Sequence, residues 1–112
     1  MRKDQTDFSH FSQLDLRVGR IVLVEDSKAK KPTYRITVDF GDEVGRKVTV
    51  GAFRNYPKEE LLGKLVIGLV NVGTKKMGEE ISEFLMLGAP NERHETIYLT
   101  PQADAPLGAE VF

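Results

Sequence analysis

Residues 47–72 read KVTVGAFRNYPKEELLGKLVIGLVNV, which predicts a strand, one short helix and another strand in that order. The segments 47–53 and 65–72 are rich in β-branched residues, as strands are. Between them, Pro57 suits the first turn of a helix and Gly63 suits its C-terminal cap. Any fold proposed for this chain must therefore place one helix between these two strands.

Further strands lie on both sides of this unit. Residues 34–40, YRITVDF, alternate apolar and polar side chains and predict a half-buried strand. Residues 16–24 predict a first strand, with Gly19 as a bulge or bend, and residues 81–87 predict a fifth. Three strands, a helix and two strands predict an all-β fold, a five-stranded OB-fold barrel with its short helix between strands three and four. A sandwich or a generic small barrel leaves that helix unexplained.

Both ends of the chain exceed a minimal barrel. Phe8, Phe11 and Leu14 are three residues apart, which predicts an N-terminal helix that packs on the core. Residues 95–101 predict a weaker strand, and a turn-rich C-terminal extension follows it. We expect these terminal segments to supply the interface of a homodimer.

The composition sets limits on organisation and function. The length of 112 residues predicts a single domain over residues 1–112, with its core at about 8–112. The absence of cysteine excludes disulfides, thiolate metal sites and a cysteine nucleophile. No apolar run approaches the roughly 18 residues of a membrane helix and no signal peptide is visible, so we expect a cytoplasmic protein without membrane insertion. With a net charge of −1, nucleic-acid binding requires a local basic patch.

The sequence does not favour catalysis. His10 and His94 are far apart in sequence and have no clustered carboxylates, so they predict neither a zinc site nor a triad. Asp39, Asp42 and Glu43 do not have the spacing of a calcium loop, and the glycines around them do not form a phosphate loop. We therefore expect a binding protein that is not an enzyme and has no metal, nucleotide or other cofactor.

Basic residues gather where an OB barrel binds its ligands. The outer face of strands two and three and the loops after strands one and four border one groove. Tyr34 or Phe53 would add a stacking surface there if exposed. The alternative is an ordinary solvated surface, which Glu79 and Glu80 support. The cations expected at this rim are Lys28, Lys30, Lys31, Arg35, Arg54, Lys75 and Lys76, the last two at a hairpin tip.

Four stretches together resemble a known family. They are DLRVGRI at 15–21, KPTYRITVDFG at 31–41, a tyrosine and helix at 56–64, and VNVGTKKMGEEISEFLMLG at 70–88. They resemble the tRNA-binding OB domain found at the C-terminus of some methionyl-tRNA synthetases and in free-standing dimeric tRNA-binding proteins. Within that family, the chain is most similar to the CsaA branch of stand-alone, secretion-related chaperones.

The resemblance implies one surface for nucleic acid or peptide. Lysines on it would meet phosphates, amide and hydroxyl groups would form hydrogen bonds, and a methionine would give an adaptable apolar contact. The implied binding residues are Arg35, Arg54, Asn71, Lys75, Lys76, Met77 and Ser82, with Lys30, Lys31 and Glu83 in support.

Two departures separate this chain from the tRNA binders. Those proteins usually continue the serine with a glycine-methionine pair, where this chain has Glu83 and Phe84, and their hairpin is more basic. The resemblance therefore implies a CsaA-type homodimer that binds unfolded or export-bound polypeptide without ATP, with a translocation ATPase as a candidate partner. The alternative is a protein that recognises tRNA by shape and phosphate contacts on the same face. A third hypothesis is an accessory domain of a larger assembly, such as a synthetase partner.

Overall fold

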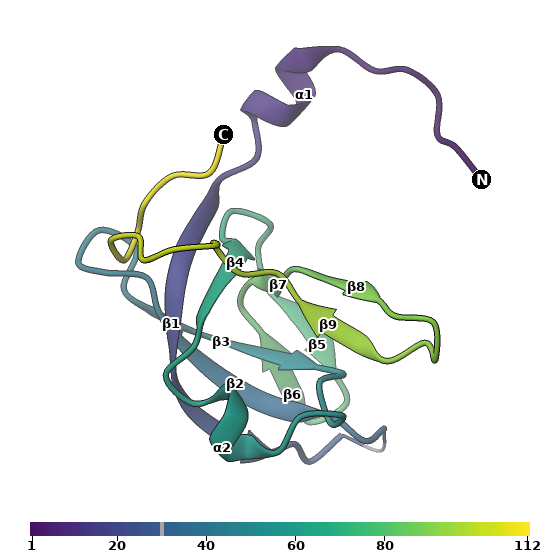
Figure 1. Cartoon of the computed structure of the whole chain (residues 1–112), viewed down its shortest axis with the longest axis vertical. Helices are drawn as coiled ribbons and strands as arrows, with labels where there is room; N and C mark the ends of the chain where they lie inside the picture. Colours follow the sequence, from purple (N-terminus) through teal and green to yellow (C-terminus); the bar gives the residue numbers. More distant parts are fainter. Residues whose placement is uncertain (30) are drawn as a thin grey trace.

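The computed structural model describes residues 1–29 and 31–112, so Lys30 lies outside the described residues (Figure 1). Strands dominate the chain, and the helices in the described part are short. The elements are α1 (Phe8–Ser12), β1 (Leu16–Asp26), β2 (Tyr34–Asp39), β3 (Arg46–Gly51), α2 (Lys58–Leu61), β4 (Leu65–Leu69), β5 (Lys75–Met77), β6 (Glu80–Ser82), β7 (Leu85–Met86), β8 (Gly88–Pro90) and β9 (Thr96–Tyr98).

Five antiparallel strands form the main sheet, in the order β3-β2-β1-β4-β7. The long strand β1 pairs with β4 over residues 16–20 and with β2 over residues 20–26, so it passes from one side of the barrel to the other. Segment 82–84 then lies against β3 and nearly closes the barrel. With α2 between β3 and β4, this is the OB fold that the sequence predicts.

The predicted strands are present, with two differences. The strand predicted at 81–87 divides into β6 and β7, because the chain bends at residues 83–84. The irregularity of β1 lies between Ile21 and Leu23 and not at Gly19, where the bulge was predicted. Gly19 pairs regularly with Val66, and a side chain at this position would overlap the core.

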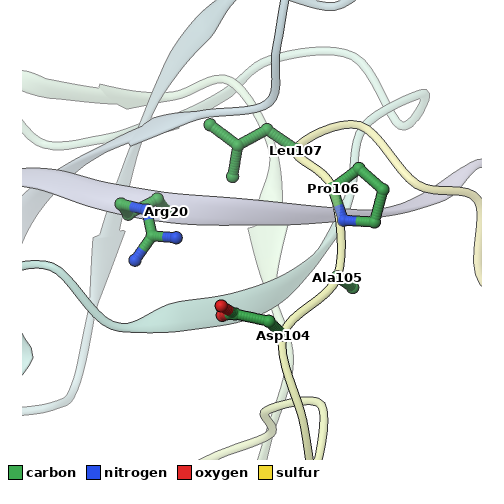
Figure 2. Close-up of a pocket in the computed structure, with 5 residues that line it drawn as sticks. All are labelled: Arg20, Asp104, Ala105, Pro106 and Leu107. Carbon is green, nitrogen blue, oxygen red and sulfur yellow. The ribbon is translucent and has the colours of Figure 1, made fainter.

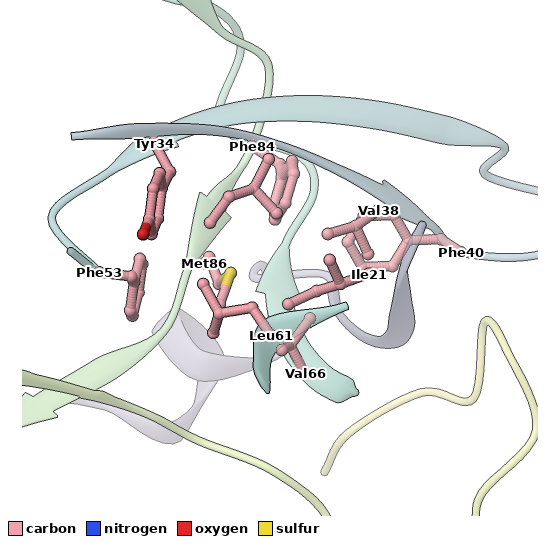
Figure 3. Packing of buried hydrophobic residues seen from close by; sticks show 10 residues of the cluster. Ile21, Tyr34, Val38, Phe40, Phe53, Leu61, Val66, Phe84 and Met86 are labelled. Carbon is pink, nitrogen blue, oxygen red and sulfur yellow. The ribbon is translucent and has the colours of Figure 1, made fainter. Parts of the chain in front are cut away.

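The core is built around Phe40, which is fully buried (Figure 3). Its ring meets that of Phe84 edge to face, with centroids 5.0 Å apart. Two glycines make room for it: a Cβ at Gly68 would lie 2.6 Å from Cζ of Phe40, and a Cβ at Gly19 would overlap Val38 and Phe40. Glycines in β1 and β4 therefore let both strands approach this ring closely.

The N-terminal helix departs from expectation. Helix α1 projects away from the barrel (Figure 1). Its apolar residues Phe8 and Phe11 are exposed, and so is Leu14 just after it. The prediction that this face packs on the core is wrong, because β1 begins only at Leu16 and the short helix does not reach back over the barrel. No helix among the described residues has the length and apolarity needed to cross a membrane.

The C-terminal segment runs beside the start of β1. Backbone hydrogen bonds join Val18 N–H to Ala109 O at 2.9 Å and Val111 N–H to Leu16 O at 2.8 Å, and Arg17 forms an isolated bridge with Glu110. The C-terminal segment therefore lies beside the start of β1, whereas the N-terminus extends beyond α1 and lies apart from it (Figure 1).

Candidate nucleic-acid and peptide interface

Side chains close the barrel at the outer edge of β3. The N–H of Val50 donates to Ser82 Oγ at 2.8 Å, and the N–H of Val48 donates to Glu83 Oε1 at 2.9 Å. One backbone bond, from Glu83 N–H to Val48 O at 2.7 Å, completes the contact. We call this set of contacts the β3 seam. In a regular sheet, backbone carbonyls of a neighbouring strand would accept hydrogen bonds from these N–H groups of β3. Here side-chain oxygens take their place.

Two predicted binding residues are therefore structural parts of the fold. Ser82 is buried and Glu83 is half-buried, and both side chains accept hydrogen bonds from β3. The Ser82-Glu83 pair in the resembling motif has a physical reason in this chain, which is closure of the barrel.

The sequence predicts the two lysines at the tip of the hairpin, but they lie on its first strand, β5. Lys75 and Lys76 are exposed, and neither forms an ion pair among the described residues. The turn itself consists of Gly78 and Glu79, with Gly78 at φ +63°, and Met77 ends β5 opposite Glu80. The lysines therefore remain available to an anionic ligand.

Arg35 lies on the outer face of β2 between carboxylates. Its Nη1 is 2.9 Å from Glu25 Oε1, and its Nε is 3.6 Å from Glu80 Oε2. Glu80 is buried and also accepts a hydrogen bond from the backbone N–H of Lys28 at 3.0 Å. Two carboxylates thus neutralise this cation within the chain.

Arg54 is likewise occupied. It donates to Thr33 O at 3.0 Å, lies over the ring of Tyr34 at 4.7 Å from the centroid, and is 3.3 Å from Asp26. The hydrogen bond from Lys58 holds the pKa of the Asp26 carboxyl below its ordinary value, and Arg54 adds to the effect. This cluster joins the loop after β1 to the start of α2.

The two aromatic residues that could have offered a stacking surface do not do so. Tyr34 and Phe53 are both buried, and the hydroxyl of Tyr34 donates to Tyr56 O at 2.8 Å. The condition for stacking, an exposed ring, is therefore not met, and for Tyr34 the reason is that the apolar face of β2 points into the core.

Asn71 serves the N-terminal segment. Its Oδ1 accepts from the N–H of Asp15 at 2.8 Å, and its Nδ2 donates to Gln13 O at 2.8 Å. Both ends of this amide are used inside the chain. Of the remaining predicted cations, Lys31 is exposed in the loop after β1.

An apolar pocket of about 410 Å³ adjoins the β3 seam. Val72 and Leu85 stand at its rim and are 51% and 52% exposed, although both are large apolar residues. Sequence reasoning missed them, because the pattern gives no sign that these apolar residues stay uncovered. We call this pocket the apolar hollow. The residues that line it are Thr49, Val50, Val72, Gly73, Lys75, Ser82, Phe84 and Leu85.

Two polar hollows lie on the other side of the segment that includes residues 79–83. They lie between the β5–β6 hairpin, the outer face of β2 and β3, and the loop after β1. Their carboxylates outnumber their cations, and we call this the carboxylate rim. Its charged residues are Glu25, Asp26, Glu79, Glu80 and Glu83, with Lys28 and Arg35 among them.

A further pocket of about 420 Å³ lies elsewhere, between β1 and the C-terminal segment (Figure 2). Arg20 faces Asp104 across it, and Arg20 Nη1 donates to Gly63 O at 2.8 Å. None of the predicted binding residues lines this pocket. Some of the predicted binding residues lie on or beside the β5–β6 hairpin, namely Arg35, Lys75, Lys76, Met77, Ser82 and Glu83. Arg54 and Asn71 lie apart from it, the first against Asp26 and the second against the N-terminal segment.

A family model described as "Putative tRNA binding domain" matches residues 16–110. The chain belongs to this family. It is 36% identical over 94% of its length to a methionine–tRNA ligase of Methanosarcina mazei, and it spans about 15% of that enzyme. The matched family is one of tRNA-binding domains, and the similarity to the ligase is confined to the part of that enzyme that this chain spans.

Solved structures extend the comparison to whole chains. A CsaA chaperone protein from Picrophilus torridus is 36% identical, with a TM-score of 0.91 over 96% of this chain and all of that one. A protein related to methionyl-tRNA synthetase from Pyrococcus horikoshii is 28% identical, with a TM-score of 0.85 over 98% of this chain and all of that one. These likenesses support a chaperone or a tRNA-binding function.

Replacing Ser82 with alanine tests the β3 seam. The change removes the hydroxyl that accepts from the buried N–H of Val50, so we expect a loss of about 1–3 kcal/mol in the free energy of unfolding. Urea denaturation measures the loss, and hydrogen exchange should accelerate at Val50. Ser12→Ala, in the exposed helix α1, is the control and should change stability by less than about 0.5 kcal/mol. Equal stability of the two variants would contradict a structural role for Ser82.

Proposed function

We propose that this chain is a cytoplasmic, ATP-independent chaperone that binds extended segments of unfolded or export-bound polypeptides as a homodimer. The observation that carries this proposal is the apolar hollow, in which Val72 and Leu85 are half exposed beside buried Phe84. Apolar side chains of a polypeptide gain free energy when they cover such a surface. A translocation ATPase is the partner we propose for delivery of the bound segment.

The charge distribution also favours a polypeptide. Arg35 and Arg54, two cations expected to meet phosphates, already have carboxylate partners within the chain. A phosphate backbone approaching Arg35 would also meet Glu79 and Glu80. Binding of RNA here would break existing ion pairs and bring like charges together.

The terminal segments support the proposed homodimer. Helix α1 exposes Phe8 to 76%, with Phe11 and Leu14 on the same short segment, and Phe112 at the other end of the chain is also exposed. Helix α1 directly precedes β1 in the chain, and the C-terminal segment runs beside the start of β1 (Figure 1). An apolar surface of this kind is typical of one that a partner covers. A second copy of the chain would bring an identical surface to it.

The alternative function is tRNA binding through the same face. It is favoured by the family to which the chain belongs and by Lys75 and Lys76, which are exposed and not neutralised by the described part of the chain. Lysines at such positions would contact phosphates without reading bases.

Replacing Leu85 with aspartate tests the chaperone proposal. A labelled peptide with an unfolded apolar core should bind the wild type, and fluorescence anisotropy should show binding weakened about tenfold or more by the variant, because an apolar contact is lost. Leu62→Asp is the matched control, since Leu62 is 53% exposed outside the hollow. If both variants bind the peptide as the wild type does, the hollow is not the site.

The double change of Lys75 and Lys76 to glutamate tests the alternative. If the chain is a tRNA binder, its affinity for bulk tRNA should fall steeply with salt and be abolished in this variant. Lys3→Glu with Lys64→Glu makes the same change in charge at exposed residues away from the hairpin. A wild-type chain that does not bind tRNA even at low salt would exclude this function.

Light scattering tests the homodimer. The wild type should have twice the chain mass of 12.6 kDa at micromolar concentration, and Phe8→Ser with Phe11→Ser should shift it toward the monomer. Leu62→Ser, again an exposed leucine far from α1 in sequence, should leave the dimer intact. A monomeric wild type would refute the proposed assembly.

A further inference from the structure

The carboxylate rim retains uncompensated negative charge. Arg35 is shared between Glu25 and Glu80, so one cation serves two carboxylates. Glu79 and Glu83 have no cation within 4 Å in the described part of the chain. The groove over β2 and β3 is therefore acidic, although this is the face where a basic patch was expected.

Burial increases the effect of these charges. The side chain of Glu80 is only 9% exposed, and the hollows that surround it have protein on several sides. Charges in a cleft with low-dielectric walls produce a stronger field than the same charges on an open surface. A cationic group that enters the groove is attracted by this field.

The acidic groove adjoins the apolar hollow. Ser82 and Phe84 line the apolar hollow, whereas Ile81 and Glu83, their neighbours in sequence, line the carboxylate rim. Glu79 is three residues from Ser82, which is about 10 Å along an extended chain. A polypeptide that fills the hollow therefore passes close to the carboxylates within a few residues.

We infer that the binding face selects polypeptide segments in which lysine or arginine lies a few residues from an apolar cluster. This inference rests on the proposed chaperone function and specifies its substrate class. The apolar side chains occupy the hollow beside Val72 and Leu85, and the basic side chains extend toward Glu79 and Glu83. Acidic segments are rejected by the same carboxylates.

Lysines on the hairpin give the bound segment a direction. Lys75 lines the apolar hollow on β5, and Glu79 lies at the turn of the same hairpin. A basic flank is repelled near Lys75 and attracted near Glu79. The segment therefore lies with its basic residues toward the hairpin turn.

Peptides that differ only in their flanks test the inference on the full chain. Three labelled peptides share one apolar core and have lysine, serine or glutamate on one side of it. We expect the lysine peptide to bind about two- to fivefold more tightly than the serine peptide for each charge pair formed, and the glutamate peptide to bind most weakly. The preference should shrink as salt rises, because these charges are partly exposed.

Charge reversal at Glu79 locates the selection. Glu79→Lys should remove most of the preference for the lysine peptide over the serine peptide. Glu92→Lys is the matched control, since it makes the same change in net charge at an exposed residue that lines neither hollow. The control should keep the wild-type preference.

The outcomes separate the two proposals. If the serine peptide binds but all three peptides bind equally, the charge selection is wrong and the chaperone function stands. If none of the peptides binds, the proposed function itself fails. A wild-type chain that prefers the glutamate peptide, or that binds tRNA more tightly than the lysine peptide, would overturn the selection.

Discussion

The edge of β3 is the constraint on which the rest of the structure depends. An edge strand with unpaired N–H groups must be covered, and here Ser82 and Glu83 accept from Val50 and Val48. The contact fixes segment 82–84, which sets Phe84 against Phe40 in the core. It also anchors the β5–β6 hairpin beside the outer face of the sheet. The fold and the candidate binding face therefore share one set of hydrogen bonds.

Local patterns in the sequence predicted most of the fold. Alternation from Tyr34 to Phe40 and the helix signals of Pro57 and Gly63 depend on neighbours in the chain, and the structure confirms them. The exposure of α1 could not be predicted, because Phe8 and Phe11 have the spacing of a buried face whether the partner is the core or another chain.

The candidate site was harder to predict, because the ion pairs of a charged residue are formed with residues distant in sequence. Arg35 forms an ion pair with Glu80, which is 45 positions away in the sequence. Hydrogen bonds behave alike, since Asn71 donates to the carbonyl of Gln13, 58 positions away. Sequence reasoning placed the cations near one groove but gave no measure of how many would be neutralised there. Ser82 shows the same limit, since a polar residue near a binding motif looks the same whether it contacts a ligand or the backbone of β3.

Closure by side chains also accounts for the apolar hollow. A full strand paired to β3 would bring its backbone within about 5 Å and cover the strand edge with its own side chains. Here only one backbone bond, from Glu83 to Val48, joins the two segments at that edge in the described part of the chain. The space beside Thr49 and Val50 stays open, and Leu85 remains half exposed at its rim. Because Ser82 and Glu83 satisfy the donors of β3 without a fully paired strand, an apolar surface stays open, and this is the surface that we propose as the polypeptide site.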